Sequence, residues 1–378
     1  MSLIDRYVLR QFVGTFLICF LSLTGLYIVF DAFTNMDQFL RCAENEGGLA
    51  ALMATYYGYH SIGFFDRTAG TITLIAAMFT VTSLQRHNEM TALLSAGISR
   101  TRLVMPVIVA AATVTCGAAL NRELVIPQCR DELARTSKDL VGDVGRELQP
   151  RYDNQTDILL RGRSTYRDRQ RIAEPSFRLP PSLDSYGSQL AAENAFYKPP
   201  EGNRPGGYLL EGVTRPKDLA SLPSLKLDGR PVVIMPRDAP GWLRADQCFV
   251  VCQINFDQLT GGRAWRECSS TLTLIAGLRN PSFDCGAAVR VAIHRRIVQP
   301  VLDITLLFLG LPLVLRRESR NVFIAMGLCM AVSACFSLVV LGFQYLGSIY
   351  SVSPALAAWA PLMIFVPMAV GMVDALWD

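Results

Sequence analysis

The sequence predicts an α+β membrane protein, with six transmembrane helices and a β-rich domain inserted between helices three and four. The first observation is composition: the chain is 51% hydrophobic and 18% charged, whereas soluble domains are about 25% charged. The second is the presence of long uncharged runs on both sides of the segment 122–290. The third is that this segment holds 24 of the 36 basic residues, 21 of the 32 acidic ones and 14 of the 20 prolines.

A membrane-spanning helix needs about 20 mostly apolar residues. Four separate runs meet this requirement: Gln11–Phe30, Thr68–Gln85 extended by Ile62–Phe65, Leu103–Asn121, and Ile297–Leu315. Asn321–Val373 then runs for 53 residues without a charge, which is too long for one span. We expect two helices there, divided at the Gly, Ser and Pro residues of Gly347–Pro354. Three spans therefore lie in 1–120 and three in 291–378, with the inserted domain at 121–290.

Arginines in short loops predict the orientation, because such residues favour the cytoplasmic side. Alternation of six spans places eight on one side: Arg6, Arg10, Arg86, Arg100, Arg102, Arg316, Arg317 and Arg320. Only Arg41 lies in a short loop on the other side. Arg290, Arg295 and Arg296 oppose the pattern, but they end a long domain, and long domains cross largely regardless of charge. We expect cytoplasmic termini and an external inserted domain.

The inserted domain reads mainly as short strands separated by Pro and Gly. The expected strands are Asp157–Leu160, Ser164–Arg167, Gly207–Val213, Pro231–Met235, Cys248–Phe256 and Ser270–Ile275. Leu133–Leu148 reads as helical, and the Pro-rich stretch Glu174–Arg204 reads mostly as loop. Regularly spaced short strands predict a sandwich, a jelly roll or an open barrel.

Ten cysteines divide by their expected compartment. Four fall in spans, where they serve as small apolar residues: Cys19, Cys116, Cys329 and Cys335. Six face the outer compartment, where disulfides are permitted with open connectivity: Cys42, Cys129, Cys248, Cys252, Cys268 and Cys285. Cys248 and Cys252 share a strand face and are not expected to bond each other. No paired CxxC spacing occurs, so neither a metal nor a cofactor is predicted.

A short amphipathic helix is predicted between spans two and three, in the stretch LQRHNEMTALLSAGISRTRL. Its apolar positions fall at i, i+3, i+4 and i+7: Met90, Leu93, Leu94 and Gly97. Asn88 is placed to cap its start and Gly97 to end it. Two interpretations stay open. The helix lies on the membrane surface, or it docks its exposed face into a cytoplasmic partner.

Five stretches together resemble the LptF/LptG permease family of lipopolysaccharide export. They are RYVLRQF at Arg6–Phe12, RHNEMTALLSAGISRTRLVMP at Arg86–Pro106, NRELVIP at Asn121–Pro127, RRIVQPVLDITLLFLGLPLVLRR at Arg295–Arg317 and SPALAAWAPLMIFV at Ser353–Val366. The resemblance covers all six spans and is most specific at Glu89–Pro106. It implies a multi-pass protein of the inner membrane whose periplasmic domain is jelly-roll-like.

The resemblance also implies a function and a set of partners. The expected function is a permease subunit of an ABC-type transporter that extracts lipopolysaccharide or a related glycolipid. The implied partners are a cytoplasmic ABC ATPase dimer, a second permease subunit of the same or a different sequence, and a periplasmic jelly-roll bridge protein. This chain is not expected to be the ATPase, because none of its four lysines is followed by Ser or Thr, as a phosphate-binding loop requires.

Two other function classes compete with transport: a membrane-anchored enzyme, or an assembly scaffold, each acting through the outer domain. No GxSxG or HExxH motif occurs in the sequence, which disfavours the common hydrolases. The only histidines are His60, His87 and His294, and none falls in the middle of the inserted domain. A net charge of +4 is too small to imply nucleic acid.

The resemblance assigns ATPase coupling to the segment 85–99. Glu89 matches the acidic position of the family's coupling motif, where a carboxylate accepts charge-assisted hydrogen bonds from a partner arginine. The alternative is that Glu89 only complements the helix dipole. Arg86, Leu93 and Gly97 complete the expected coupling site.

Three residues are candidates for a lipid cavity. A charge within a span is costly and usually faces a partner or a cavity, so Asp303 is expected either to pair with Arg67 or to line a lipid path. Members of the family meet lipid phosphates with basic residues at the outer end of span one. This region here contains Asp31 and Asp37, and Arg41 is its only basic residue.

The segment RGRSTYRDRQR at Arg161–Arg171 is a further basic candidate outside the spans. On an extended strand, Arg167, Arg169 and Arg171 would share one face. That face either meets anionic lipid or is simply solvated.

Overall fold

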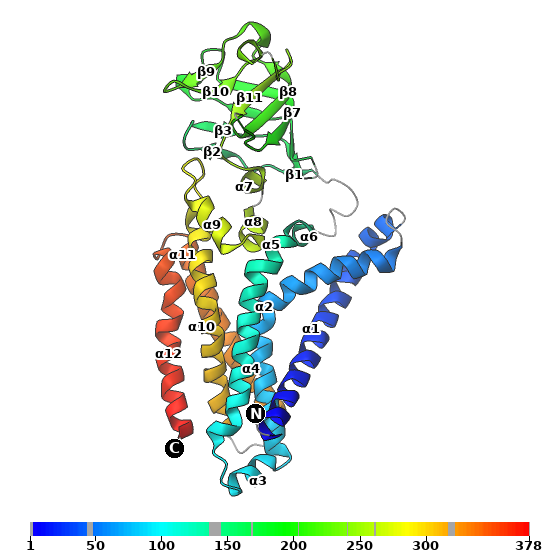
Figure 1. Ribbon diagram of the computed structural model, residues 1–378, viewed down its shortest axis with the longest axis vertical. Coiled ribbons are helices and arrows are strands. Elements are labelled where there is room, and N and C mark those ends of the chain that lie inside the picture. The colour runs from blue at the N-terminus through cyan, green and yellow to red at the C-terminus, as the bar shows by residue number, and fades with distance from the viewer. Residues whose placement is uncertain are drawn as a thin grey trace. The chain divides into compact units, whose positions relative to one another are not determined.

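The computed structural model describes residues 3–43, 48–135, 145–167, 169–202, 204–239, 241–260, 262–316 and 322–377 (Figure 1). Two compact units divide the chain: a helical unit, Met1–Leu133 with Gly286–Asp378, and a β-rich unit, Ala134–Cys285. The expected inserted domain, 121–290, is therefore somewhat too long at both ends. Helical structure continues past Asn121, and the helix of span four already begins at Gly286.

In the described residues, six helices are long and apolar enough to cross a membrane, as predicted. The helical elements are α1 Leu3–Ala43, α2 Leu49–Arg86, α3 Glu89–Ser95, α4 Arg100–Leu120, the π-helical turn η1 Asn121–Val125, α5 Ile126–Gln128, α6 Arg130–Ala134, α10 Gly286–Arg316, α11 Val322–Ser348 and α12 Pro354–Trp377. The long uncharged run divides where expected. The Ser353 side chain accepts a hydrogen bond from Leu356 N at 3.3 Å, and Pro354 opens α12, a favoured first position. Arg317 and Arg320, used for the orientation, lie outside the described residues.

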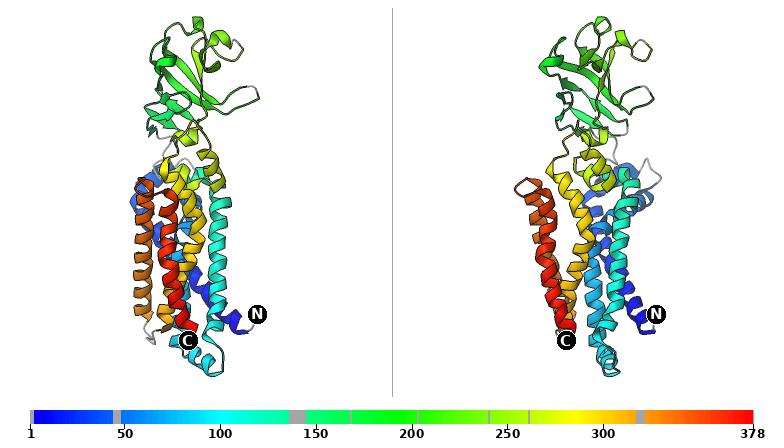
Figure 2. Two further views of the ribbon diagram at one scale, coloured as in Figure 1. Left: turned by 90° about the vertical axis from the view of Figure 1, so that its left-hand side faces the viewer. Right: turned by 60° about the vertical axis from the view of Figure 1, so that its left-hand side comes forward.

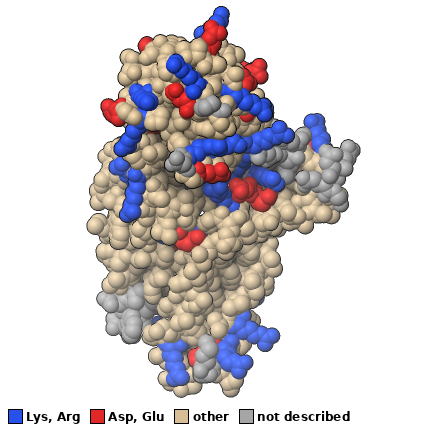
Figure 3. Space-filling view, turned by 45° about the horizontal axis from the view of Figure 1, so that its top comes forward, with Lys and Arg blue, Asp and Glu red and all other residues tan. Residues whose placement is uncertain are grey.

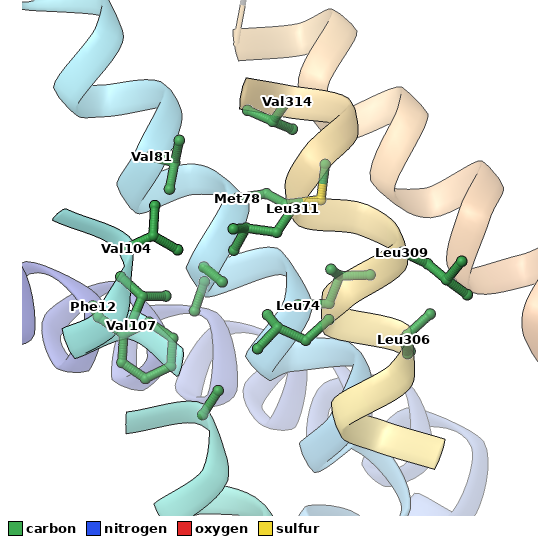
Figure 4. Packing of buried hydrophobic residues seen from close by; sticks show 14 of the residues in the cluster. Phe12, Leu74, Met78, Val81, Val104, Val107, Leu306, Leu309, Leu311 and Val314 are labelled. Carbon is green, nitrogen blue, oxygen red and sulfur yellow. The ribbon is translucent and has the colours of Figure 1, made fainter. Parts of the chain in front are cut away.

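Helices α2 and α10 form the centre of the helical unit. In the most apolar stretch of each helix, 61% of the residues of α2 and 56% of those of α10 are buried. The corresponding fractions are 17% in α1, 17% in α11 and 22% in α12. Figure 4 shows Leu74 and Met78 of α2 meeting Leu306 and Leu311 of α10 in this core. Figure 2 shows α10, α11 and α12 side by side, as their contacts require.

Glycines allow the two central helices to approach closely, as small residues commonly do in membranes. A Cβ atom added to Gly70 of α2 would lie 2.5 Å from the Asp303 Oδ1 atom of α10. A Cβ added to Gly310 of α10 would overlap the Leu74 side chain of α2. On the face seen in Figure 3, the sides of the helical bundle are nearly free of charged side chains. Large apolar side chains such as Ile18 and Leu21 are exposed on α1, as expected for a helix in contact with lipid.

The β-rich unit contains an antiparallel sheet of 11 strands among its described residues. The strands are β1 Arg146–Glu147, β2 Arg151–Asp153, β3 Ile158–Leu160, β4 Ser164–Tyr166, β5 Arg171–Ala173, β6 Ser176–Arg178, β7 Gln189–Lys198, β8 Gly207–Arg215, β9 Leu225–Leu227, β10 Arg230–Ile234 and β11 Gln247–Val251. The main path runs β1-β4-β5-β7-β8-β11-β10-β9, and β2-β3-β6 joins it at β7. Phe177, Tyr208 and Phe249 are fully buried in its interior. The predicted β-rich insertion is confirmed.

Short helices complete this unit: η3 Pro181–Leu183, η4 Leu219–Ser221, η5 Pro236–Asp238, α7 Phe256–Thr260, α8 Gly262–Cys268 and α9 Thr271–Leu278. The strand predicted at Ser270–Ile275 is wrong, because that run forms α9. The Ser270 Oγ atom accepts a hydrogen bond from Thr273 N at 3.2 Å and so caps the helix. Short apolar runs do not distinguish helix from strand by periodicity alone.

Three further expectations for the β-rich unit are corrected. Glu174–Arg204 is not mostly loop, since it contains β6 and the ten-residue strand β7. The helix expected over Leu133–Leu148 does not reach its end: residues 136–144 lie outside the described residues, and Arg146–Glu147 is a strand. The strand expected at Cys248–Phe256 ends at Val251, and Phe256 begins α7.

The arginine-rich segment forms a hairpin instead of one strand face. Arg167 and Arg169 lie in the turn between β4 and β5, and Asp168 lies outside the described residues. The guanidinium of Arg171 stacks over the Tyr166 ring, 4.2 Å from its centroid. The three arginines therefore do not line up along one strand.

Two cysteines of the β-rich unit are deeply buried: Cys248 is 0% exposed and Cys252 is 3% exposed. Burial raises the pKa of the Cys248 thiol to about 12, so it stays neutral at physiological pH. Burial also raises the pKa of Cys252 above its usual range, with a smaller contribution from Asp153. Cys248 behaves as a small apolar group of the core, whereas the Cys252 Sγ atom also accepts a hydrogen bond from Ile254 N at 3.4 Å.

Candidate coupling site and membrane charge cluster

The amphipathic stretch between spans two and three folds as α3, a helix of seven residues. It is shorter than the expected segment 85–99, because Gln85 and Arg86 still belong to α2. Asn88 adopts the left-handed conformation with φ of 60° and makes no side-chain cap, so the predicted cap is wrong. A residue in that conformation turns the chain between the two helices.

The end of α3 follows the prediction for Gly97. This residue has φ of +83°, a conformation that favours glycine. Its N–H donates to the Leu94 carbonyl at 3.0 Å, and the Ile98 N–H donates to the Leu93 carbonyl at 3.1 Å. These two bonds form a Schellman motif, which satisfies the last carbonyls of the helix.

One face of α3 is packed and the other is exposed. Met90 is 6% exposed and belongs to the core of the helical unit, with Leu93 and Leu94 partly buried against it. The opposite face presents small side chains: Thr91, Ala92, Ser95 and Ala96. The predicted apolar stripe thus packs on the protein's own spans, and a face without bulky groups is available for contact with a partner.

Glu89, the first residue of α3, bonds to the beginning of α1. The Tyr7 hydroxyl lies 3.1 Å and 3.0 Å from the two carboxylate oxygens of Glu89 and donates to them. Arg86 is exposed in the last turn of α2. Sequence reasoning missed Tyr7, because 82 residues separate it from Glu89. Its only signal was its place within the RYVLRQF stretch.

A second group of polar side chains joins the central helices where α4 passes into η1. Arg122 Nε lies 2.9 Å from Asp66 Oδ1, and the two side chains are 10% and 16% exposed. The next residue, Glu123, lies 3.9 Å from Arg296 of α10, whose side chain is 8% exposed. Adjacent residues of η1 thus reach two different helices. Single π-helical turns of this kind occur frequently at functional sites.

Asp303 lies deeper along α10 and is held by an uncharged partner. It accepts a hydrogen bond from Gln299 Nε2 at 2.8 Å. The pairing with Arg67 expected from the sequence stays a prediction.

The remaining lipid-cavity candidates are both exposed: Arg67 on α2 and Arg41 in the last turn of α1. Earlier in α1, before Arg41, Asp31 accepts hydrogen bonds from Tyr57 at 2.9 Å and from Asn35 at 3.1 Å. An acidic group bonded to α2 thus occupies this part of span one. The role of Arg41, Arg67 and Asp303 at a lipid cavity stays a prediction.

Among the residues that the structure describes, no group of three His, Cys, Asp or Glu side chains is arranged to hold a metal ion. The six long apolar helices, the inserted antiparallel sheet and charges within the spans define a multi-pass membrane protein. The family model described as "Lipopolysaccharide export system permease LptF/LptG" matches residues 6–166 and 257–373. The chain belongs to this family of transport permeases. No curated protein matches the chain.

Proposed function

We propose that the chain is a transmembrane subunit of an ATP-driven exporter that extracts lipopolysaccharide or a related glycolipid from the inner membrane. A separate cytoplasmic ABC ATPase dimer hydrolyses the ATP, and a second permease subunit of the same family, identical or different, completes the membrane assembly. The β-rich unit receives the lipid and passes it to a periplasmic jelly-roll bridge protein. Family membership supports this proposal, and α3 is the structural observation that carries it.

Helix α3 has the properties of a coupling element. Its packed face, which includes Met90, joins it to the core of the spans. Its exposed face has only small side chains, which allow close approach by a groove of a partner. Glu89 stands at its start, where a partner arginine donates charge-assisted hydrogen bonds. Movement of the ATPase is thereby transmitted to the packed spans.

The spans offer a lipid-facing surface for the substrate. The most apolar stretch of α1 is 17% buried, so most of that helix faces lipid or a second subunit. In our proposal Arg41 and Arg67 meet acidic groups of the glycolipid, and Asp303 lines its path. Asp31 gives span one an acidic rather than a basic character, which favours a glycolipid that depends less on phosphate at this position.

Replacement of Glu89 by Ala is expected to weaken ATPase docking by well over tenfold, since loss of one partner of a buried charged pair costs about 2–5 kcal/mol. Leu93→Asp is expected to be worse, because it places a charge on the partly buried face of α3. The measurements are co-purification of the ATPase and lipid-stimulated ATP hydrolysis by the assembled complex.

Thr101→Ala is the matched control for Glu89→Ala, because Thr101 is exposed near α3 but does not belong to its docking face. Membrane insertion should be intact in all three variants, since none of them places a charge within a span. Full ATPase association and full lipid extraction by Glu89→Ala would assign coupling to other residues and leave Glu89 with only a dipole role. A complex without any lipid-stimulated turnover would favour a scaffold over a transporter.

The proposed orientation places the termini in the cytoplasm and the β-rich unit in the periplasm. Glu201 is exposed in that unit, and its backbone forms an isolated β-bridge with Arg204. A Glu201→Cys variant is therefore expected to react with a membrane-impermeant maleimide in cells with a permeable outer membrane and an intact inner membrane. Labelling is compared with that of the same chain without the introduced cysteine. Reaction only after the inner membrane is lysed would reverse the topology.

A further inference from the structure

The first turns of α1 and the start of α3 are joined by a side-chain hydrogen bond. The Tyr7 hydroxyl is nearly equidistant, at 3.1 Å and 3.0 Å, from the two carboxylate oxygens of Glu89. It therefore lies between the two oxygens and donates a bifurcated hydrogen bond to both. A carboxylate has about four lone-pair sites, so the outer edges of Glu89 stay available to another donor.

Apolar packing supports the same junction. Val8, the neighbour of Tyr7, is 0% exposed, and Met90, the neighbour of Glu89, is 6% exposed. Both belong to one core cluster, with Ile4 and Leu93 packed against it. Each partner of the Tyr7–Glu89 bond is thus followed by a residue anchored in the same core, which limits how far the two helices can separate at this point.

The rest of α1 is held more loosely than the other spans that surround it. It packs mainly against α2 and α4. Only 17% of its most apolar stretch is buried, against 61% in α2 and 44% in α4. Within this chain, a displacement applied at its α3 end is therefore opposed mainly by α2 and α4.

We infer that Tyr7 is a positioning residue that ties span one to the coupling helix, so that α1 follows α3 when the ATPase changes nucleotide state. Tyr7 acts through Glu89 and does not touch the transported lipid. This inference rests on the proposed ATPase coupling at α3 and extends it, because it names the span that receives the movement.

The test uses Tyr7→Phe in the full chain assembled with its ATPase and second permease subunit. The substitution removes one hydroxyl and keeps the ring. ATPase association should be retained, while lipid-stimulated ATP turnover and lipid release fall about tenfold, as expected for a lost hydrogen bond to a charged group. Tyr345→Phe is the matched control, since Tyr345 of α11 is 66% exposed and far from α3 in the chain. It should behave as the unmodified protein.

A distance measurement separates failure of this inference from failure of the proposed function. Spin labels at Leu3→Cys on α1 and at Ser99→Cys, just after α3, occupy exposed positions away from the docking face. The distribution of distances between the two labels should stay the same across nucleotide states in the parent chain. It should become broader when Tyr7→Phe is added. Unchanged distances with Tyr7→Phe, or full turnover, would overturn the inference, as would tighter ATPase binding, which would make Tyr7 a competitor of the partner. A different outcome is that Glu89→Ala keeps full ATPase association while the distances still broaden in Tyr7→Phe. In that case the link between α1 and α3 through Tyr7 is supported, and the proposed coupling role of Glu89 fails.

Discussion

Arg122→Leu is expected to destabilise the helical unit by about 3–5 kcal/mol, because it leaves the Asp66 carboxylate without its cation in a nearly buried position. The two side chains are 10% and 16% exposed and meet at 2.9 Å. Arg122 also lies in the π-helical turn that places Glu123 near Arg296. Loss of this arginine therefore loosens the connection of α4 to both α2 and α10.

Thermal unfolding of the detergent-purified chain measures this effect. The double variant Asp66→Leu, Arg122→Leu should recover much of the lost stability, since it removes both charges together. Arg163→Leu is a close control: Arg163 lies at the same 2.9 Å from Glu174, but those side chains are 75% and 65% exposed. Exposed pairs contribute about 0–1 kcal/mol. Equal losses from Arg122→Leu and Arg163→Leu would mean that burial of the Asp66–Arg122 pair is not the cause.

The six spans were predictable because their signal is local. A run of about 20 apolar residues has few alternatives to a spanning helix. The division of the last run was equally local, because Gly347 lies near the end of α11 and Pro354 begins α12. The same reasoning predicted the apolar face of α3 and its end at Gly97.

The β-rich unit was harder to predict because pairing between distant strands decides it. Strand β7, with the sequence QLAAENAFYK, contains alanines, Glu and Asn, which have weak strand preference. It is nevertheless the longest strand, because it pairs with β5, β6 and β8. Because the surrounding sequence is rich in proline, the segment was predicted to be mostly loop and this strand was missed.

The contacts of the candidate sites were the least predictable part. Glu89 was identified from the sequence, but its partner Tyr7 was not, because no periodicity connects residues 82 apart. Asp303 was identified as a costly charge, yet its hydrogen bond comes from Gln299 one turn earlier on the same helix. The Asp66–Arg122 pair links α2 to η1 and depends on how those elements cross. Residue types predicted where chemistry lies, and only the packing determined which side chains meet.

Gly207→Ala is expected to destabilise the β-rich unit by about 3 kcal/mol, toward the upper end of the range for overpacking a core. Gly207 is buried at the start of β8, opposite Val251 of β11. A Cβ atom there would overlap the backbone oxygen of Val250 and lie 3.0 Å from the Phe249 ring. Neither group can yield easily, since Val250 and Phe249 are both 0% exposed. The two strands would have to separate at this point.

Hydrogen–deuterium exchange of the full chain locates this effect. Amides of β8 and β11 should exchange about 100-fold faster in Gly207→Ala, the factor that corresponds to roughly 3 kcal/mol if exchange follows unfolding of the β-rich unit. Exchange in α2 and α10 should be unchanged, because those helices belong to the other compact unit. Gly241→Ala is the matched control, since a Cβ there meets no atom within 4 Å. If both variants exchange like the parent chain, β8 and β11 accommodate the methyl group, and close approach is not what requires glycine at position 207.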